Sequence, residues 1–254
     1  MVAMTEYAPG TPSWVDVSTP DMEATKAFYG GLFGWEATSF PDMGGYTNFT
    51  MNGKLVCGAG PTMSSDQPPA WSTYISVKDA DATAQAVRDN GGQVTLPPMD
   101  VMALGRMAVF QDPTGAFFSI WQPGEHKGAQ IANELGSFCW NELDTRDMDT
   151  AKAFYTKVFP WVADTQGPAG MDYTQWRLNG RSIGGGMQMG TQFPATVPPH
   201  WLTYFSVADT DATVAKAQAL GGTAIMPAMD SPQGRFAVIG DPQGAVFAVI
   251  ALKL

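Results

Sequence analysis

The chain contains an internal repeat, and this repeat constrains the fold more than any other feature of the sequence. The segment from Trp14 to Trp35, WVDVSTPDMEATKAFYGGLFGW, recurs from Trp140 to Trp161 as WNELDTRDMDTAKAFYTKVFPW, with ten of the 22 aligned positions identical. Later segments match in the same order, PPAWSTYISVKDADAT with PPHWLTYFSVADTDAT and GRMAVFQDPTGAFF with GRFAVIGDPQGAVF. Because the matches extend through nearly the whole chain, they predict a tandem duplication of one structural unit.

The duplication predicts two domains of similar size. We place the first domain over residues 1–125, a linker over 126–135 and the second domain over 136–254. A chain of 254 residues fits one large domain or two small ones, and either arrangement can bury a full core. Apolar residues make up 44% of the chain and charged residues only 15%, below the ~25% typical of soluble domains, which excludes a disordered chain.

Each unit shows the order strand, helix and three further strands twice. At the start of the chain SWVDVS alternates like a strand, and Thr19 or Asp21 can cap a helix over MEATKAFYGGLF. Short strands over WEATSF, GYTNFTM and KLVCGA follow, separated by PDMG and NG. The second half of the unit repeats this order, with a helix over DADATAQAVRDN that ends at a Gly-Gly pair. We therefore predict an α+β fold of four βαβββ modules.

These features resemble a known superfamily. A helix with Phe28-Tyr29 near its end, Gly-Gly after the second helix and a final Asp-Pro-x-Gly hairpin are similar to the vicinal oxygen chelate superfamily. That superfamily includes glyoxalases, extradiol dioxygenases, fosfomycin-resistance enzymes and bleomycin-binding proteins, and the resemblance covers almost the whole chain. The two-unit, Trp-rich form is most similar to actinobacterial proteins named glyoxalase-like or hydroxylase. The resemblance implies two glyoxalase-like domains, each with a curled mixed sheet that forms a cleft.

The resemblance also implies where the metal ligands of the superfamily would fall on this sequence. The four positions fall on Trp14, on Thr73, on Ser119 and near Cys57 in the first unit, and on Trp140, on Thr203, on Ala248 and near Gly185 in the second. Zinc, nickel, iron and manganese sites need three or four imidazole, carboxylate or thiolate donors, which these positions do not offer. The two histidines, His126 and His200, are assigned surface or structural roles. We therefore expect no metal and no other cofactor.

The alternation of side chains along a strand predicts the lining of each cleft, because residues two apart point to the same face. The predicted lining of the first cleft is Trp14, Asp16, Trp71, Thr73, Phe117, Ser119 and Trp121. The predicted lining of the second cleft is Trp140, Glu142, Trp201, Thr203, Phe205, Val246, Ala248 and Ile250. Tyr74 and Tyr204 are predicted to face the core. An apolar pocket with a few polar groups is typical of a small-molecule site, although the same aromatic residues are also compatible with a closed barrel core.

Each predicted lining contains one carboxylate, Asp16 or Glu142, at matching positions. A buried carboxylate without a partner is costly or has a raised pKa, so a partner or water is needed. Arg106 and Arg235 are the candidate partners, and the alternative is that they are rim charges in contact with solvent. In a binding protein the carboxylate would pair with a cationic or hydroxylated part of an aromatic ligand. In an enzyme it would be a general acid or base.

Three classes of function are compatible with these features. The first hypothesis is a metal-independent small-molecule-binding protein, of the sequestration, resistance or carrier type, that holds a hydrophobic or aromatic ligand in one or both clefts. The alternative is a glyoxalase- or hydroxylase-like enzyme, a lyase or oxidoreductase. Such an enzyme would use Asp16 or Glu142 as the acid-base group, or a divalent metal at a site that the motifs do not reveal. The third class is a protein-interaction role for exposed loops.

Charge, hydropathy and cysteine usage limit the partners. The formal net charge is −10 and no basic cluster is present, so nucleic acid is not an expected partner. No apolar segment is long enough to span a membrane and no signal peptide is recognisable, which predicts a cytoplasmic protein unless it is exported by a non-classical route. Cys57 and Cys139 are predicted to be buried apolar side chains. A monomer already contains the paired modules, and a homodimer is also compatible.

Overall fold

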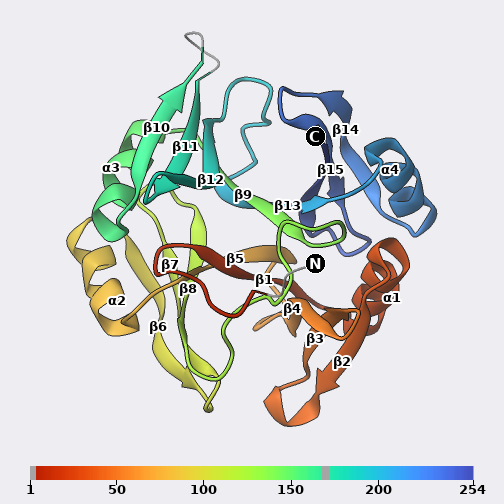
Figure 1. Ribbon diagram of the computed structural model, residues 1–254, viewed down its shortest axis with the longest axis horizontal. Coiled ribbons are helices and arrows are strands. Elements are labelled where there is room, and N and C mark those ends of the chain that lie inside the picture. The colour runs from red at the N-terminus through yellow and green to blue at the C-terminus, as the bar shows by residue number, and fades with distance from the viewer. Residues whose placement is uncertain (1–3, 168–171, 254) are drawn as a thin grey trace.

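The computed structural model describes residues 4–167 and 172–253, and within them the chain forms two units with the same order of elements (Figure 1). The first unit contains β1 (Pro12–Thr19), α1 (Met22–Phe33), β2 (Glu36–Phe40), a 3-10 helix (Pro41–Met43), β3 (Tyr46–Met51), β4 (Lys54–Pro61), β5 (Ala70–Ser76), α2 (Ala80–Asp89), β6 (Gln93–Val101), β7 (Gly105–Gln111) and β8 (Phe117–Pro123). The second unit contains β9 (Phe138–Thr145), α3 (Met148–Val158), β10 (Val162–Gln166), β11 (Tyr173–Leu178), β12 (Arg181–Gln188), β13 (His200–Ser206), α4 (Thr210–Ala219), β14 (Thr223–Asp230), β15 (Gly234–Gly240) and β16 (Val246–Leu252). The predicted βαβββ order is confirmed in all four modules.

Each unit forms one open, mixed sheet of eight strands. The strand order is β2-β3-β4-β1-β5-β8-β7-β6 in the first unit and β10-β11-β12-β9-β13-β16-β15-β14 in the second. The first and last strands of a module are parallel neighbours, as β1 and β4 show, because the helix carries the chain across the sheet. The first strands of the two modules, β1 and β5, pair antiparallel and join the modules at the centre of the sheet. The α+β fold with two mixed sheets is confirmed, and neither sheet closes into a barrel.

An aspartate caps the start of the helix in every module. Asp21, Asp79, Asp147 and Asp209 each accept a hydrogen bond from the backbone N–H three residues later, at 2.9–3.0 Å. A side-chain acceptor at this position satisfies one of the unpaired N–H groups of the first turn. The NG turns also follow the sequence, since Asn52 and Gly53 both have positive φ angles, of 53° and 72°. This is the geometry of a two-residue type I′ hairpin.

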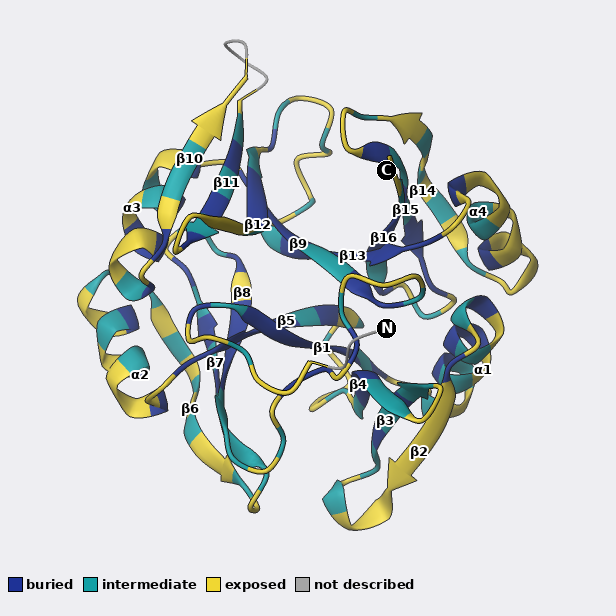
Figure 2. Cartoon of the chain, in the orientation of Figure 1, coloured by how far each residue is buried: buried dark blue, intermediate teal, exposed yellow. Residues whose placement is uncertain are grey.

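The two units pack through the faces of the sheets that carry the helices. In Figure 1, α1 lies beside α4 on one flank and α2 beside α3 on the other, so each helix pair contains one helix from each unit. Tyr29 of α1 packs against Phe247 of β16, with ring centroids 5.6 Å apart, and Tyr155 of α3 packs against Phe118 of β8 at 5.4 Å. Figure 2 shows that buried residues concentrate on the central strands β1, β5, β9 and β13. Most of the core is therefore shared between the units.

Two matching hydrogen-bonded chains cross between the units. The Trp71 indole donates to the Tyr29 hydroxyl at 2.9 Å, and that hydroxyl donates to Asp241 of the second unit at 3.0 Å. Trp201 donates in the same way to Tyr155 at 2.9 Å, and Tyr155 donates to Asp112 of the first unit at 2.9 Å. The repeated Phe-Tyr and Asp-Pro-x-Gly motifs therefore hold the units together.

Candidate functional site

The strand register decides which side chains share a face. Trp14 lies opposite Tyr74 and Asp16 lies opposite Ser72, so these side chains point to the face of the first sheet that is turned away from the second unit, called here the outer face. The outer face of the first sheet carries Trp14, Asp16, Tyr74, Ser119 and Trp121. The outer face of the second sheet carries Trp140, Glu142, Asp144, Tyr204, Val246, Ala248 and Ile250. The two acids predicted for the site therefore do lie on matching faces.

A hydrogen-bonded network surrounds the acid of the first unit. The Trp14 indole donates to the Tyr46 hydroxyl at 2.9 Å, and Tyr46 donates to Oδ2 of Asp16 at 3.0 Å. Tyr74 donates to the same oxygen at 3.0 Å. Burial raises the pKa of Asp16 to about 6, although the two phenol hydrogen bonds lower it. The phenols therefore satisfy a carboxyl group that is only 8% exposed.

The second unit repeats this network. The Trp140 indole donates to the Tyr173 hydroxyl at 2.8 Å, and Tyr204 donates to Oε1 of Glu142 at 2.7 Å. Burial raises the pKa of Glu142, while the neighbouring Tyr173 and Tyr204 hydroxyls act in the opposite direction. A Trp-Tyr-acid-Tyr set thus stands at the same place in both sheets.

Two glycines make room for the networks. Gly58 of β4 lies beside Asp16, and Gly185 of β12 lies beside Glu142. A Cβ atom at Gly58 would overlap the Tyr46 hydroxyl, and one at Gly185 would overlap the Tyr173 hydroxyl. The tyrosine of the neighbouring strand therefore occupies the space that a side chain from β4 or β12 would fill.

The two outer faces differ in what covers them. In the first unit the His126 ring, from the segment between β8 and β9, lies edge-on against Trp14 at 4.5 Å and against Trp121 at 5.5 Å. Burial lowers the pKa of this imidazole to about 4. Trp14 keeps only 4% of its surface exposed, whereas Trp140 at the matching position is half-buried. The indole of the second unit is therefore the more accessible one.

The second unit also has two polar residues that the first lacks. Asp144 and His200 lie opposite each other on β9 and β13, where the first unit has Ser18 and Ala70. His200 Nε2 lies 3.6 Å from Oδ2 of Asp144. Burial and the neighbouring Glu142 both raise the pKa of Asp144 well above its ordinary value. Neither residue was predicted as part of a site.

A cavity of ≈ 450 Å³ adjoins the second unit. It lies between the N-terminal segment and the strands β9, β11 and β12 with their connecting turn. Its walls include Tyr7, Phe138, Trp140, Leu178 and Ile183, together with Glu6 and Arg181. Trp140 therefore lines a cavity and belongs to the network of Glu142.

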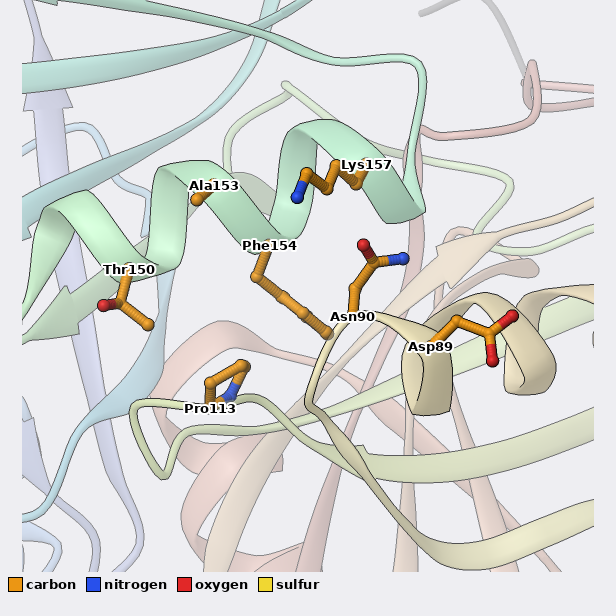
Figure 3. Close-up of a pocket in the computed structure, with 7 residues that line it drawn as sticks. All are labelled: Asp89, Asn90, Pro113, Thr150, Ala153, Phe154 and Lys157. Atoms are coloured by element: carbon orange, nitrogen blue, oxygen red, sulfur yellow. The ribbon is translucent and has the colours of Figure 1, made fainter.

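A second hollow, of ≈ 330 Å³, lies between α2 and α3 (Figure 3). Asn90, Phe154 and Lys157 line it, and it contains none of the predicted site residues. On the opposite flank of the molecule Leu220 lies against Gly31 of α1, so the matching position is filled. The hollow therefore lies where Asn90 and Lys157 take the places of Leu220 and Gly31.

Several predicted lining residues lie on the wrong face. The residues that point toward the other unit are Trp71, Thr73, Trp201, Thr203 and Phe205. Thr73 and Thr203 both donate to Oδ1 of Asn141, at 2.9 and 3.3 Å, between the units. The prediction that they share a face with Trp14 or Trp140 is wrong because a shift of one residue along a strand reverses the face. For the same reason Tyr74 and Tyr204, predicted for the core, lie on the outer faces.

The predicted pairing of the two arginines with the acids is also wrong. Arg106 bonds Asp81 and Asp100 at 2.9 and 2.8 Å, and Arg235 bonds Asp211 at 2.6 Å. Each arginine joins the start of a helix to the edge hairpin of its sheet. Of the remaining predicted residues, Ser119 and Trp121 are buried on the outer face, whereas Phe117 is 54% exposed at the start of β8.

Tyr46 and Tyr173 are functional-site candidates that the sequence analysis missed. They occupy matching places in the repeat, in GYTNFTM and DYTQWRL, and extending the alignment of the units through these strands would have found them. Their partners Trp14 and Trp140 lie 32 and 33 residues away in the sequence, so only the folded sheet shows the contact.

Comparison with known proteins agrees with this geometry. The sequence profile of the Glyoxalase/Bleomycin resistance protein/Dioxygenase superfamily matches residues 11–120, and the profile of the glyoxalase-like domain matches residues 140–250. The chain belongs to this superfamily. Anthracycline biosynthesis protein DauV from Streptomyces sp. (strain C5) is 41% identical to it, over 98% of this chain and 96% of that protein. CFP32 of Mycobacterium tuberculosis, which is named as a glyoxylase, is 43% identical over 98% of both chains.

Solved structures of the superfamily share the fold. The Mn(II)-bound glyoxalase from Novosphingobium aromaticivorans superposes with a TM-score of 0.67 at 16% identity, over 96% of this chain and 83% of that one. The 2,2',3-trihydroxybiphenyl 1,2-dioxygenase from Sphingomonas wittichii strain RW1 gives 0.66 at 13% identity, over 96% of this chain and 91% of that one. At sequence identities of 16% and 13%, the similarity to these two structures is a similarity of fold.

A divalent metal ion, such as the Mn(II) of the Novosphingobium glyoxalase, does not fit the residues at the centres of the two outer faces. At the centre of the first outer face stand an indole, two phenols and one acid, which already accepts both phenol hydrogen bonds. The second outer face carries the same groups and a second acid, Asp144. Gly58 and Gly185 offer no donor, and tyrosine hydroxyls fill the space above them. Within residues 4–167 and 172–253, no three His, Cys, Asp or Glu side chains are grouped so as to hold a metal ion. In the same part of the chain, none of the helices combines the length and apolar character needed to cross a membrane.

Proposed function

We propose that this protein binds a mainly apolar, aromatic small molecule at its second unit, without the help of a metal ion. One observation carries the proposal: Trp140 lines the ≈ 450 Å³ cavity and is also hydrogen-bonded to Tyr173, beside the buried Glu142. Cavities of roughly 300–1,000 Å³ are typical of small-molecule sites. A ligand in contact with the indole would therefore be linked through Tyr173 to a buried acid, although Glu142 does not line the cavity itself.

The walls of the cavity favour a flat aromatic ligand. Tyr7, Phe138 and Trp140 supply ring surfaces, and Leu178 and Ile183 supply aliphatic ones. Aromatic pairs gain about 0.5–1.5 kcal/mol beyond the burial of their area. Glu6 and Arg181 provide a few polar contacts that would fix the orientation of the ligand, as is usual in such sites.

The relatives suggest a chemical class. Two of them, at 41% and 40% identity over 98% of this chain, are named anthracycline biosynthesis proteins. Anthracyclines are polycyclic aromatic compounds, and a polycyclic aromatic ligand matches the ring-lined cavity. We therefore take an anthracycline-like compound as the ligand class of the proposal.

The test compares matching tryptophans. An anthracycline is titrated into the protein and its own fluorescence is followed. Trp140→Ala is expected to weaken binding at least about tenfold, since it removes the wall of the cavity. Trp14→Ala is the matched control, because Trp14 is covered by His126, and it should leave the affinity within about threefold of wild type. Equal losses in both variants, or no saturable binding to the wild type, would overturn the proposal.

The second candidate function is an acid-base enzyme acting on the same class of ligand. It is favoured by the buried carboxyl group of Glu142, which lies beside two phenol hydroxyls and whose pKa is raised by burial, as is usual for a general acid. Glu142→Gln distinguishes the two candidates. In an enzyme this variant abolishes turnover while the substrate still binds, whereas in a binding protein it changes affinity alone.

A further inference from the structure

The second unit carries two acids where the first carries one. Glu142 matches Asp16, and Asp144 matches Ser18, two residues further along the first strand of each unit. The Ser18 hydroxyl donates to the carbonyl oxygen of Ala70 at 3.2 Å, so the first unit satisfies this position by itself. The additional acid therefore distinguishes the units chemically.

Asp144 is buried without enough hydrogen-bond partners. Its exposed fraction is 2%, and Oδ1 has no partner among the described residues. Its other oxygen, Oδ2, lies 3.6 Å from His200 Nε2, which is longer than a hydrogen bond. A buried polar atom without a partner is unfavourable, and in a native protein it calls for a water, an ion or a ligand group as its partner.

The protein itself supplies little positive charge at this place. Within the described residues, neither Glu142 nor Asp144 forms an ion pair with a lysine or an arginine. Arg146, on the same segment, donates instead to the carbonyl oxygens of Pro194 and Val197 at 2.9 and 3.1 Å. The Nδ1 atom of His200 lies 2.9 Å from the carbonyl oxygen of Pro198, and burial lowers the pKa of this imidazole. A neutral imidazole at His200 carries no positive charge that could pair with Glu142 or Asp144.

We propose that Glu142 and Asp144 together bind a protonated amine of the ligand, at Oδ1 of Asp144. This inference rests on the proposed function and names the part of the ligand that the second unit selects. An ammonium group carries three donors and a positive charge, whereas a hydroxyl group carries one donor and no charge. Tyr173, Tyr204 and Trp140 stand on the same face, and their rings attract a cation. The acids do not line the cavity themselves, so the aromatic part of the compound would contact Trp140 in the cavity and its amine would reach along β9 to Asp144.

The test compares an anthracycline that carries a charged amino group with its N-acetyl derivative, which carries no charge there. An anthracycline with a free amino group and the same compound N-acetylated differ by the positive charge and by the added acetyl group. Affinities of both are measured for the wild type, for Asp144→Ser, which installs the residue of the first unit, and for Asp144→Asn, which keeps the size of the side chain. Ser18→Ala, in the first unit, is the matched control.

The wild type and Ser18→Ala are expected to bind the free amine at least roughly tenfold more tightly than the N-acetyl compound. Both Asp144 variants should reduce this preference to less than about threefold, with the affinity for the N-acetyl compound unchanged. If the wild type binds both compounds equally well, or if the preference survives in both Asp144 variants, the inference is wrong and the proposed function stands. If the wild type binds neither compound, the proposed function fails and this inference fails with it.

Discussion

Trp140 is half-buried at the position where Trp14, its counterpart in the first unit, keeps only 4% of its surface exposed. The two indoles make the same hydrogen bond to a tyrosine, at 2.8 and 2.9 Å. What separates them is His126, whose ring covers Trp14 and has no counterpart against Trp140 among the aromatic contacts of the described residues. The two units therefore differ in that one of the matching indoles is covered and the other is partly accessible.

The covering role of His126 can be measured by its titration. Burial between two indoles lowers its pKa to about 4 from an ordinary value of 6.5. The chain has only two histidines, so NMR of the imidazole signals resolves both, and His200→Gln assigns them. We expect the His126 signals to change with a midpoint near pH 4, and a midpoint near 6.5 would mean that the ring is solvated and does not cover Trp14.

The acid of the first unit makes a testable contribution to stability. Asp16 releases its proton near pH 3.8 when the chain is unfolded and near 6 when it is folded. Between these values the folded state holds more protons, so the free energy of unfolding falls as pH rises. Asp16→Asn does not titrate. Its stability relative to wild type should therefore increase by about 2.4 kcal/mol between pH 4 and pH 7, measured by urea unfolding. A constant difference across this range would contradict the raised pKa.

The fold could be predicted from the sequence because short local motifs mark where its helices and turns begin and end. An Asp cap, a Phe-Tyr helix and an NG turn each act over a few residues, and all of them appear in the structure where the sequence places them. The candidate site was harder to predict, because the faces of β5 and β13 depend on register. An error of one residue moved Thr73 and Thr203 to the wrong face.

Asp16 and Glu142 were found from the sequence because they follow Trp14 and Trp140 by two residues on a strand, where the face is easily counted. Their partners could not be found in this way. Tyr46 reaches Asp16 across β4 only because Gly58 leaves space, and that is a property of three neighbouring strands.

The hydrogen bonds between the units should contribute measurably to stability. Tyr29→Phe leaves Oδ2 of Asp241 and the Trp71 indole without their shared partner, in a buried setting. We expect a loss of about 1–3 kcal/mol in the free energy of unfolding. Tyr155→Phe, its counterpart on the other flank, should cost a similar amount. Losses below about 0.5 kcal/mol in both variants would show that these contacts do not hold the units together.

The two glycines under the tyrosines give a paired test of the networks. An alanine Cβ at Gly58 or Gly185 must displace the Tyr46 or Tyr173 hydroxyl. Both substitutions are expected to lower the free energy of unfolding by about 1–3 kcal/mol. Only Gly185→Ala should also weaken ligand binding, because the displaced Tyr173 accepts a hydrogen bond from Trp140, which lines the cavity. Equal effects on binding would contradict the assignment of the ligand to the second unit.

The central claim is that a single aromatic ligand binds without a metal ion, and native mass spectrometry tests it most directly. The protein is treated with a chelator, exchanged into volatile buffer and sprayed with an anthracycline, with and without added Mn²⁺. We predict one ligand per chain under both conditions and no stoichiometric metal in either. Binding of the ligand only together with one Mn²⁺ per chain would contradict the account, since it would require a metal centre at the outer face.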